Sequence, residues 1–425
     1  MDQNRKSLNL NLRSLKPSAT VAINEHCNAL LAEGKTVYKL GLGQSPFPVP
    51  DIVVKALQDN AFQKDYLPVK GLRPLREMVA QYHSNREGIG CTAEGVLIGP
   101  GSKELMFLLQ LAFYGELVIP APSWVSYAPQ AQIIGRNVRF VQTQREDGWR
   151  LTASGLEELC LRDPDRPRVL ILNYPNNPTG GTYSESELKD LAEVSRRFGI
   201  ILLSDEIYGE VQHDGKHVSI ARFYPEGTII SGGISKWCGA GGWRLGTFVF
   251  PKELHWLLDS MATAASETYT STSAPIQYAS IAAYTPSPEI EEYLRHSRRV
   301  LGVCGNWVAE RLRASAIHCP QPAGGFYVFP DLSGHSEKLA KRGIHTSEEL
   351  CTRLLSETGV ALLPGSDFGR PLSELTVRVA YVNFDGSLAL KAAAQVSGDL
   401  DESFLRAHCD KVCIAIDALC HWASR

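Results

Sequence analysis

Long apolar runs and an excess of one charge are both missing from this sequence of 425 residues. Its longest apolar stretches, such as residues 106–114, are far shorter than the roughly 20 residues that a helix needs to cross a bilayer. Lys and Arg total 43 against 46 Asp and Glu, and no long basic run occurs that would follow a nucleic-acid backbone. We therefore expect neither a membrane nor a nucleic acid as a partner.

The cysteines and histidines lack the spacings of metal or redox sites. None of the 10 cysteines belongs to a Cys-x-x-Cys pair, and the 11 histidines show no metal-ligand spacing. No apolar segment of signal-peptide length follows Met1, and no strand-like run leads into a Gly-x-Gly-x-x-Gly turn. These absences predict a reduced, cytoplasmic protein that uses neither a metal ion nor a dinucleotide.

Short apolar runs alternate with helix-like segments through the centre of the chain. The runs lie at residues 117–119, 169–172, 200–203 and 228–230. They are rich in β-branched residues, which is typical of strands buried on both faces of a parallel sheet. The alternation predicts an α/β fold with a mainly parallel central sheet flanked by helices.

Capping signals mark two of the helix-like segments. Ser184 and Glu187 have the spacing of a capping box, and Gly199 suits the end of the helix that they begin. Ser154 and Glu157 repeat this spacing before a shorter segment, so we expect Ser154 to begin a helix there.

The two ends of the chain differ from its centre, because long amphipathic helices dominate them. Examples are residues 297–313 and 346–358. We therefore expect a large domain at residues 45–290 and a smaller α/β domain that residues 14–44 and 291–425 form together.

Unusual polar residues follow three of the predicted strands. Residues 173–180 come after one run, residues 204–209 after the next, and residues 231–236 after the last. In open α/β sheets, ligands bind beyond the carboxyl ends of the strands. These segments would therefore bring Asn177, an Asp–Tyr pair and Lys236 to one rim of the sheet.

Pyridoxal-phosphate chemistry would explain that set of side chains. Lys236 offers the amine that forms a Schiff base with an aldehyde, and Asp205 offers the carboxylate that keeps a pyridine nitrogen protonated. The turn at residues 100–103 opens an apolar helix, where unpaired N–H groups favour a phosphate. Arg244 follows in a glycine-rich segment, and its guanidinium can bind a phosphate with two N–H groups.

Taken in order, these motifs resemble those of the class I aminotransferases, which are fold-type I pyridoxal-phosphate enzymes of the aspartate and aromatic aminotransferase kind. The matching stretches lie at residues 66–71, 100–103, 122–124, 176–180, 204–209, 235–236 with 244, 364–368 and 377–378. They span most of the chain, from about residue 40 to residue 385. The resemblance implies a large cofactor-binding domain with a mainly parallel sheet, and a smaller domain built from both chain ends.

The resemblance also implies roles in binding pyridoxal 5'-phosphate. Lys236 would be the Schiff-base lysine and would carry the proton between the substrate Cα and the cofactor, and Asp205 would pair with the ring nitrogen. Tyr208 and Asn177 would bond to the phenolate oxygen of the ring, and Trp124 would stack on its face. The phosphate would be held by Gly101, Ser102, Lys103, Ser235 and Arg244.

Substrate contacts and a shared dimer follow from the same resemblance. Arg378 would grip the α-carboxylate with a planar fork that a lysine cannot present, and the backbone of Gly43 would lie near it. Trp124 and Asn177 would line the substrate as well as the cofactor. Tyr66 would reach the phosphate of the neighbouring subunit, which implies a homodimer with shared active sites.

Two departures from the family pattern affect the substrate side. The sequence reads Gly-Gln-Ser-Pro-Phe from Gly43, where many relatives read Gly-Glu-Pro-Asp-Phe. Gly233 stands where many relatives have a hydroxyl, so that this phosphate contact is either missing or supplied by Ser231 or Ser235.

We expect a ping-pong transfer of an amino group from an L-amino acid to a 2-oxo acid, with 2-oxoglutarate as acceptor. Lys103 favours aspartate or glutamate as one substrate, whereas Trp124, Tyr66 and Phe47 leave aromatic or prephenate-like donors open. A carbon–sulfur β-lyase or an aminocyclopropane-carboxylate-synthase-like enzyme would keep the same residues and is the alternative. A cofactor-binding protein without activity is a further one.

Overall fold

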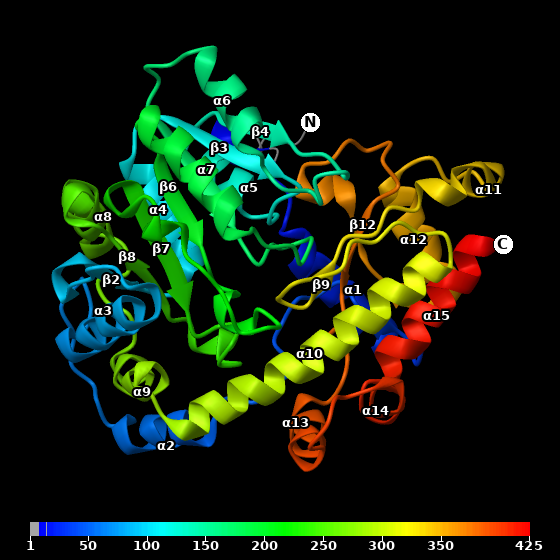
Figure 1. Cartoon of the computed structure of the whole chain (residues 1–425). Coiled ribbons are helices and arrows are strands. Elements are labelled where there is room, and N and C mark those ends of the chain that lie inside the picture. The colour runs from blue at the N-terminus through cyan, green and yellow to red at the C-terminus, as the bar shows by residue number, and fades with distance from the viewer. Residues whose placement is uncertain (1–7, 14) are drawn as a thin grey trace.

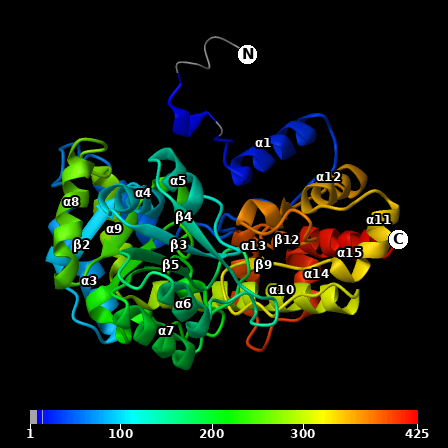
Figure 2. The same ribbon diagram turned by 90° about the horizontal axis from the view of Figure 1, so that it is seen from above.

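The computed structural model describes residues 8–13 and 15–425. Its elements form two bodies, one built on a seven-stranded sheet and the other on two small sheets (Figure 1). In the view of Figure 2 the two bodies lie side by side, and helix α1 (Ala19–Ala32) lies above the place where they meet.

The large sheet has the strand order β2-β8-β7-β6-β5-β3-β4. Its strands are β2 (Val96–Gly99), β3 (Glu116–Ala121), β4 (Val138–Gln142), β5 (Arg168–Asn173), β6 (Ile201–Asp205), β7 (Thr228–Gly233) and β8 (Gly246–Val249). Neighbours run parallel except at β8, which is antiparallel to both β2 and β7. The mainly parallel sheet that the sequence predicts is therefore confirmed.

The large sheet is buried on both faces, because successive residues of a strand point to opposite sides. Along β5, Val169 and Ile171 pack into the core that contains residues of α4 (Ser102–Ala112) and α8 (His255–Ser266). Leu170 and Leu172 pack on the other side against α6 (Ala153–Leu161) and α7 (Glu185–Arg197). This double burial is why the strands read as continuous apolar runs.

Of the two capping boxes predicted from the sequence, one is present in the structure and the other is not. At α7 the Ser184 hydroxyl accepts from the Glu187 N–H and the Glu187 carboxylate accepts from the Ser184 N–H, as predicted. At α6 the prediction is wrong, because Thr152 is the N-cap and its hydroxyl accepts from the Gly155 N–H. Ser154 is instead part of the first turn, and its hydroxyl lies 3.2 Å from that of Thr152.

The second body joins the two ends of the chain. Strand β1 (Tyr38–Lys39) pairs in parallel with β10 (Val360–Ala361), and β12 (Val377–Ala380) lies between β11 (Leu363–Pro364) and β9 (Tyr327–Val328) in an antiparallel sheet. The helices of this body after residue 330 are α11 (Ser336–Lys341), α12 (Ser347–Thr358), α13 (Gly386–Gln395), α14 (Glu402–His408) and α15 (Asp410–Ser424).

Helix α10 (Pro288–Ala314) links the two bodies, and it contains the predicted helix at residues 297–313. In Figure 1 it runs from beside α9 (Ala274–Tyr284) and α2 (Asp51–Asn60) to α15. The predicted domain boundary after residue 290 falls in its first turn, and the extents of the two domains stay a prediction. Within residues 8–13 and 15–425, no helix is both long and apolar enough to cross a membrane.

Candidate active site

A cavity of about 630 Å³ opens at the carboxyl ends of β5, β6 and β7 and reaches β9 and β12 of the second body. Most of the side chains predicted to form a site line it. They are Gly43, Ser102, Lys103, Trp124, Asn177, Asp205, Tyr208, Ser235, Lys236, Arg244 and Arg378. Gly101 lies just outside the lining, and Tyr66 lies on the surface with 90% of its area exposed.

Lys236 follows β7 and points its amine into this cavity. Its Nζ donates to the carbonyl oxygen of Gly43 at 2.9 Å, and the amine lies 5.6 Å from the centre of the Tyr208 ring. Burial lowers the pKa of this amine to about 8, and the positive charge of Arg378 adds to the effect. A far larger fraction of Lys236 is therefore neutral, and nucleophilic, than of a lysine in water.

Asp205 ends β6 and is buried, with 3% of its surface exposed. The hydroxyl of Tyr127, on α5 (Tyr127–Ile133), donates to its Oδ2 at 2.5 Å, and the Ser231 hydroxyl donates to its Oδ1 at 3.4 Å. Burial raises the pKa of Asp205 to about 6 although these hydrogen bonds lower it. The carboxyl group is therefore placed to bind a protonated partner, such as a ring nitrogen.

Arg378 lies on β12 and is almost fully buried, with 1% of its surface exposed. Its Nη1 donates to the Asn177 side-chain oxygen at 3.0 Å, and its Nη2 donates to the Gly41 carbonyl oxygen at 2.5 Å. Among the described residues no carboxylate lies within ion-pair distance of this guanidinium, and its Nε has no hydrogen-bond partner. A buried guanidinium is costly without an anion, so the cavity is built to receive one.

The start of α4 and Arg244 form one wall of the cavity. Gly101 caps α4 with φ of +92°, and a Cβ at that position would lie 2.1 Å from Nη2 of Arg244. The positive φ favours glycine at this position, and the Arg244 guanidinium lies against the helix start, where it donates to the Pro100 carbonyl oxygen at 3.2 Å. Lys103 adds a second cation, and its Nζ lies 5.2 Å from the ring centre of Trp124.

The charges on the cavity wall are unbalanced. Among the described residues that line it, Lys103, Lys236, Arg244 and Arg378 are basic and Asp205 is the one acid. The helix dipole of α4 adds further positive potential at the same end. The cavity therefore favours a ligand that carries several negative charges.

Tyr327 is a prominent site residue that the sequence reasoning missed. It lies on β9 beside Tyr208, with 2.9 Å between the two hydroxyl oxygens, and its hydroxyl donates to the Gly43 carbonyl oxygen at 3.4 Å. A Cβ on Gly43 would lie 1.8 Å from the Tyr327 hydroxyl oxygen. The signal that could have found Tyr327 is the pair of glycines at 324–325 directly before an aromatic strand.

Tyr127 and Asn173 were also missed, although both lie close to motifs that were noticed. Tyr127 lies three residues after Trp124 and donates its hydroxyl to the Asp205 carboxylate, and the Asn173 side chain donates to the Asp205 carbonyl oxygen at 2.8 Å. The remaining lining residues are Thr20 of α1, Leu42, Gln44, Ile207, Gly241 and Gly242.

The positions of Ser231 and Ser235 distinguish them as candidates for the phosphate contact that Gly233 cannot make. Ser235 lines the cavity, whereas the Ser231 hydroxyl is fully buried against Asp205 and lines a different, smaller cavity. Gly233 has φ of +150°, and a Cβ there would lie 2.8 Å from the Leu245 carbonyl oxygen. A hydroxyl-bearing residue at position 233 would therefore be strained in this chain.

Comparison with known proteins decides the family. Residues 35–387 match the family described as aminotransferase class I and II. This chain belongs to that family. Its members depend on pyridoxal phosphate, so the predictions of an aminotransferase and of this cofactor are confirmed, together with the fold.

Relatives match over most of their length. The aspartate aminotransferase of Geobacillus stearothermophilus is 34% identical over 382 residues, which cover 87% of this chain and 92% of that protein. The aspartate/prephenate aminotransferase of Thermus thermophilus is 30% identical and covers 92% of this chain and 99% of that one. The solved Thermus thermophilus aspartate aminotransferase with maleate superposes with a TM-score of 0.81 at 29% identity, over 91% of this chain and 97% of that chain.

The residues around the cavity fit pyridoxal phosphate. The cofactor carries an aldehyde, a pyridine nitrogen and a phosphate, and the wall offers a partly neutral lysine, a buried carboxyl group and a helix start with two cations. Arg378 comes from β12 of the second body, and its unpaired Nε leaves a place for a substrate anion.

Proposed function

We propose that this aminotransferase accepts dicarboxylic substrates, with aspartate as donor and 2-oxoglutarate as the acceptor that becomes glutamate. The observation that carries the proposal is that two cations, Arg378 and Lys103, line the same cavity and neither has a carboxylate partner among the described residues. Two carboxylates of one substrate would satisfy both. The names of the relatives, which include aspartate and aspartate/prephenate aminotransferases, support the same substrate class.

Bound pyridoxal phosphate would supply an aldehyde that takes up the amino group and a ring that withdraws electrons. Lys236 would hold the cofactor covalently and would carry the proton to and from the substrate Cα with its Nζ. Its lowered pKa supports this role, because a base must be neutral to accept a proton. Asp205 would hold the proton on the ring nitrogen, and Tyr127 would keep the Asp205 carboxyl group oriented.

The remaining wall residues would orient the two ligands. Gly101, Ser102, Ser235 and Arg244 would bind the phosphate, Lys103 would lie beside it at the start of α4 and reach the second carboxylate of the substrate, and Trp124 would cover the ring. Tyr208 and Asn177 would bond to the ring oxygen, while Arg378 would bind the α-carboxylate beside the backbone of Gly43.

We further propose a homodimer in which Tyr66 completes the active site of the partner. Its side chain is 90% exposed in the single chain, which is unusual for a tyrosine and leaves its hydroxyl open to a second copy. Sedimentation would show two chains per particle. Mixing Tyr66→Phe and Lys236→Ala proteins should then restore part of the activity, since one of the two sites in a mixed dimer would be intact. The cytoplasmic location stays a prediction from the sequence.

The test of the proposed function is a panel of amino donors with 2-oxoglutarate. Aspartate should give the highest kcat/KM, with aromatic and prephenate-like donors as comparison. Release of ammonia and pyruvate, in place of glutamate formation, would favour the lyase alternative. No turnover with any donor, despite a bound cofactor, would favour a binding protein.

A further inference from the structure

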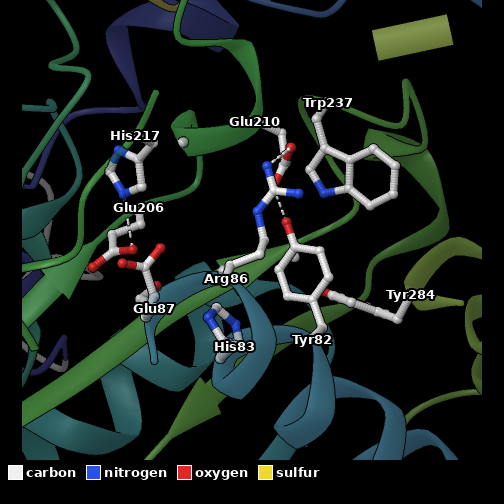
Figure 3. Close-up of a pocket in the computed structure, with 13 residues that line it drawn as sticks. Tyr82, His83, Arg86, Glu87, Glu206, Glu210, His217, Trp237 and Tyr284 are labelled. Carbon is white, nitrogen blue, oxygen red and sulfur yellow. Dashed lines mark hydrogen bonds and ion pairs between the residues drawn. The ribbon is translucent and has the colours of Figure 1, made fainter. Parts of the chain in front are cut away.

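A second group of buried polar side chains lies on the far side of β6 from the active-site cavity. We call Glu87, Ser204, Glu206, His217 and Ser219 the rear cluster. Glu87, Glu206 and His217 line a small cavity of about 40 Å³. Figure 3 shows the carboxylates of Glu206 and Glu87 side by side beneath the His217 ring. Nothing in the function proposed above uses these residues.

Glu206 is the centre of the rear cluster. Its Oε1 accepts from the Ser204 hydroxyl at 2.7 Å and from the Ser219 hydroxyl at 2.5 Å, and its Oε2 lies 2.9 Å from Nε2 of His217. The side chains of Glu206 and His217 are only 6% and 9% exposed. One hydrogen bond from β6 and two from the segment at 217–219 therefore fix one carboxylate.

Glu206 directly follows Asp205, and the chain sends the two carboxyl groups to opposite sides. The Glu206 N–H donates to the Ser231 carbonyl oxygen at 2.9 Å, and the Ser231 hydroxyl reaches the Asp205 carboxylate at 3.4 Å. The next residue, Ile207, donates its backbone N–H to the Asp205 carboxylate. The backbone of residues 205–207 is thus bonded to β7 and to the Asp205 carboxylate, while the Glu206 side chain that leaves this backbone is fixed by Ser204, Ser219 and His217.

We propose that Glu206, fixed by His217, is a positioning residue that sets the orientation of Asp205 toward the ring nitrogen of the cofactor. The inference rests on the role proposed above for Asp205. It explains why a carboxylate that touches neither ligand has three partners in the interior, where an unpaired charge would be costly.

The charges around the rear cluster favour an ion pair between Glu206 and His217. Burial alone would raise the pKa of Glu206, but His217 brings it below its usual value, and Glu206 in turn raises the pKa of His217. On α3 (Arg73–Glu87), burial raises the pKa of Glu87 and lowers that of His83 to about 4.

Three arginines neutralise the other carboxylates that face this region. The Arg222 Nε donates to Glu87 at 2.8 Å. Arg86 and Arg298, the latter on α10, donate to Glu210 at 2.6 Å and 2.9 Å. His217 is therefore the cation that remains for Glu206.

The test compares the affinity of the apoprotein for pyridoxal phosphate with its affinity for the 1-deaza analogue, in which carbon replaces the ring nitrogen. Tryptophan fluorescence follows both titrations, because Trp124 lines the cavity. In Glu206→Gln the dissociation constant for pyridoxal phosphate should rise about tenfold, whereas that for the analogue should stay within twofold. A general loss of structure would weaken both ligands equally.

Glu116→Gln is the matched control. Glu116 is a buried carboxylate at the opposite end of the same sheet, paired with Arg168 at 3.2 Å, so its loss should lower the unfolding temperature and leave both affinities unchanged. His217→Gln should repeat the effect of Glu206→Gln, and the double variant should be no weaker than Glu206→Gln alone.

Each outcome decides the proposal. Equal weakening of both ligands in Glu206→Gln, or no weakening of either, would overturn it. If Glu206→Gln does not fold, His217→Gln decides in the same way, because it keeps the carboxylate. If the unsubstituted protein binds pyridoxal phosphate and its analogue with equal affinity, Asp205 does not bind the ring nitrogen. The proposed function must then be revised.

Discussion

Replacing Arg378 with lysine should weaken the binding of every amino acid substrate by a similar factor. Lysine keeps the positive charge but cannot donate two parallel hydrogen bonds to one carboxylate. Arg378 already uses Nη1 on Asn177 and Nη2 on Gly41, which hold its plane in one orientation. A shorter point charge on β12 would lose both contacts and the orientation.

The expected magnitude follows from the kind of bond that is lost. A hydrogen bond to a charged group contributes about 1.5–3 kcal/mol, and about 1.4 kcal/mol corresponds to a factor of ten. We therefore expect KM to rise about 10- to 100-fold for each donor. The assay is a steady-state measurement of the donor half-reaction with acidic, aliphatic and aromatic amino acids, at saturating acceptor.

Two controls separate binding from folding. The unfolding temperature of Arg378→Lys should stay close to that of the unsubstituted protein, since the side chain remains charged and lies among the same rings of Tyr327 and Phe368. The affinity for pyridoxal phosphate should also be retained. A loss confined to aspartate and glutamate would refute the reasoning, because it would place Arg378 at the substrate side chain.

Further predictions concern the other wall residues. Lys103→Gln should raise KM for aspartate and glutamate about tenfold and leave alanine unchanged; an equal loss for alanine would contradict the substrate proposal. Lys236→Ala should abolish the visible absorption of the bound cofactor, and an unchanged spectrum would mean that another lysine holds it. Because burial lowers the pKa of Lys236 to about 8 from 10.5, cofactor uptake by the apoprotein should accelerate as the pH rises through 8 and then level off; continued acceleration to pH 10 would contradict this. Gly43→Ala should lower both stability, by about 1–3 kcal/mol, and turnover, because its Cβ would meet the Tyr327 hydroxyl at 1.8 Å; normal values for both would show that the two segments can separate.

The central sheet could be predicted because its strands are buried on both faces. Such strands must be apolar along their whole length, so they stand out between polar loops, and the residues that follow them share one edge by geometry alone. Lys236, Asp205 and Asn177 were found in this way. The wrong cap at α6 has a local cause, because two hydroxyl residues lie two positions apart and the backbone makes Thr152 the N-cap, which puts Ser154 in the first turn.

The part of the site supplied by the second body was harder to find. Strand β9 has two residues, so no periodic pattern announces Tyr327. Tyr127 belongs to a short helix, and its role depends on Asp205, which is far away in the sequence. The rear cluster combines residues of α3, β6 and the segment at 217–219, and no spacing in the sequence connects them. Arg378 was placed by resemblance, whereas its lack of a carboxylate partner is visible only in three dimensions.

Reduction of the purified protein with borohydride, followed by peptide mapping, tests the central claim most directly. Borohydride fixes the cofactor to the lysine that holds it, so the account predicts a phosphopyridoxyl group on the peptide that contains Lys236 and on no other. A label on a different lysine, or a protein that retains no cofactor after reduction, would contradict the account.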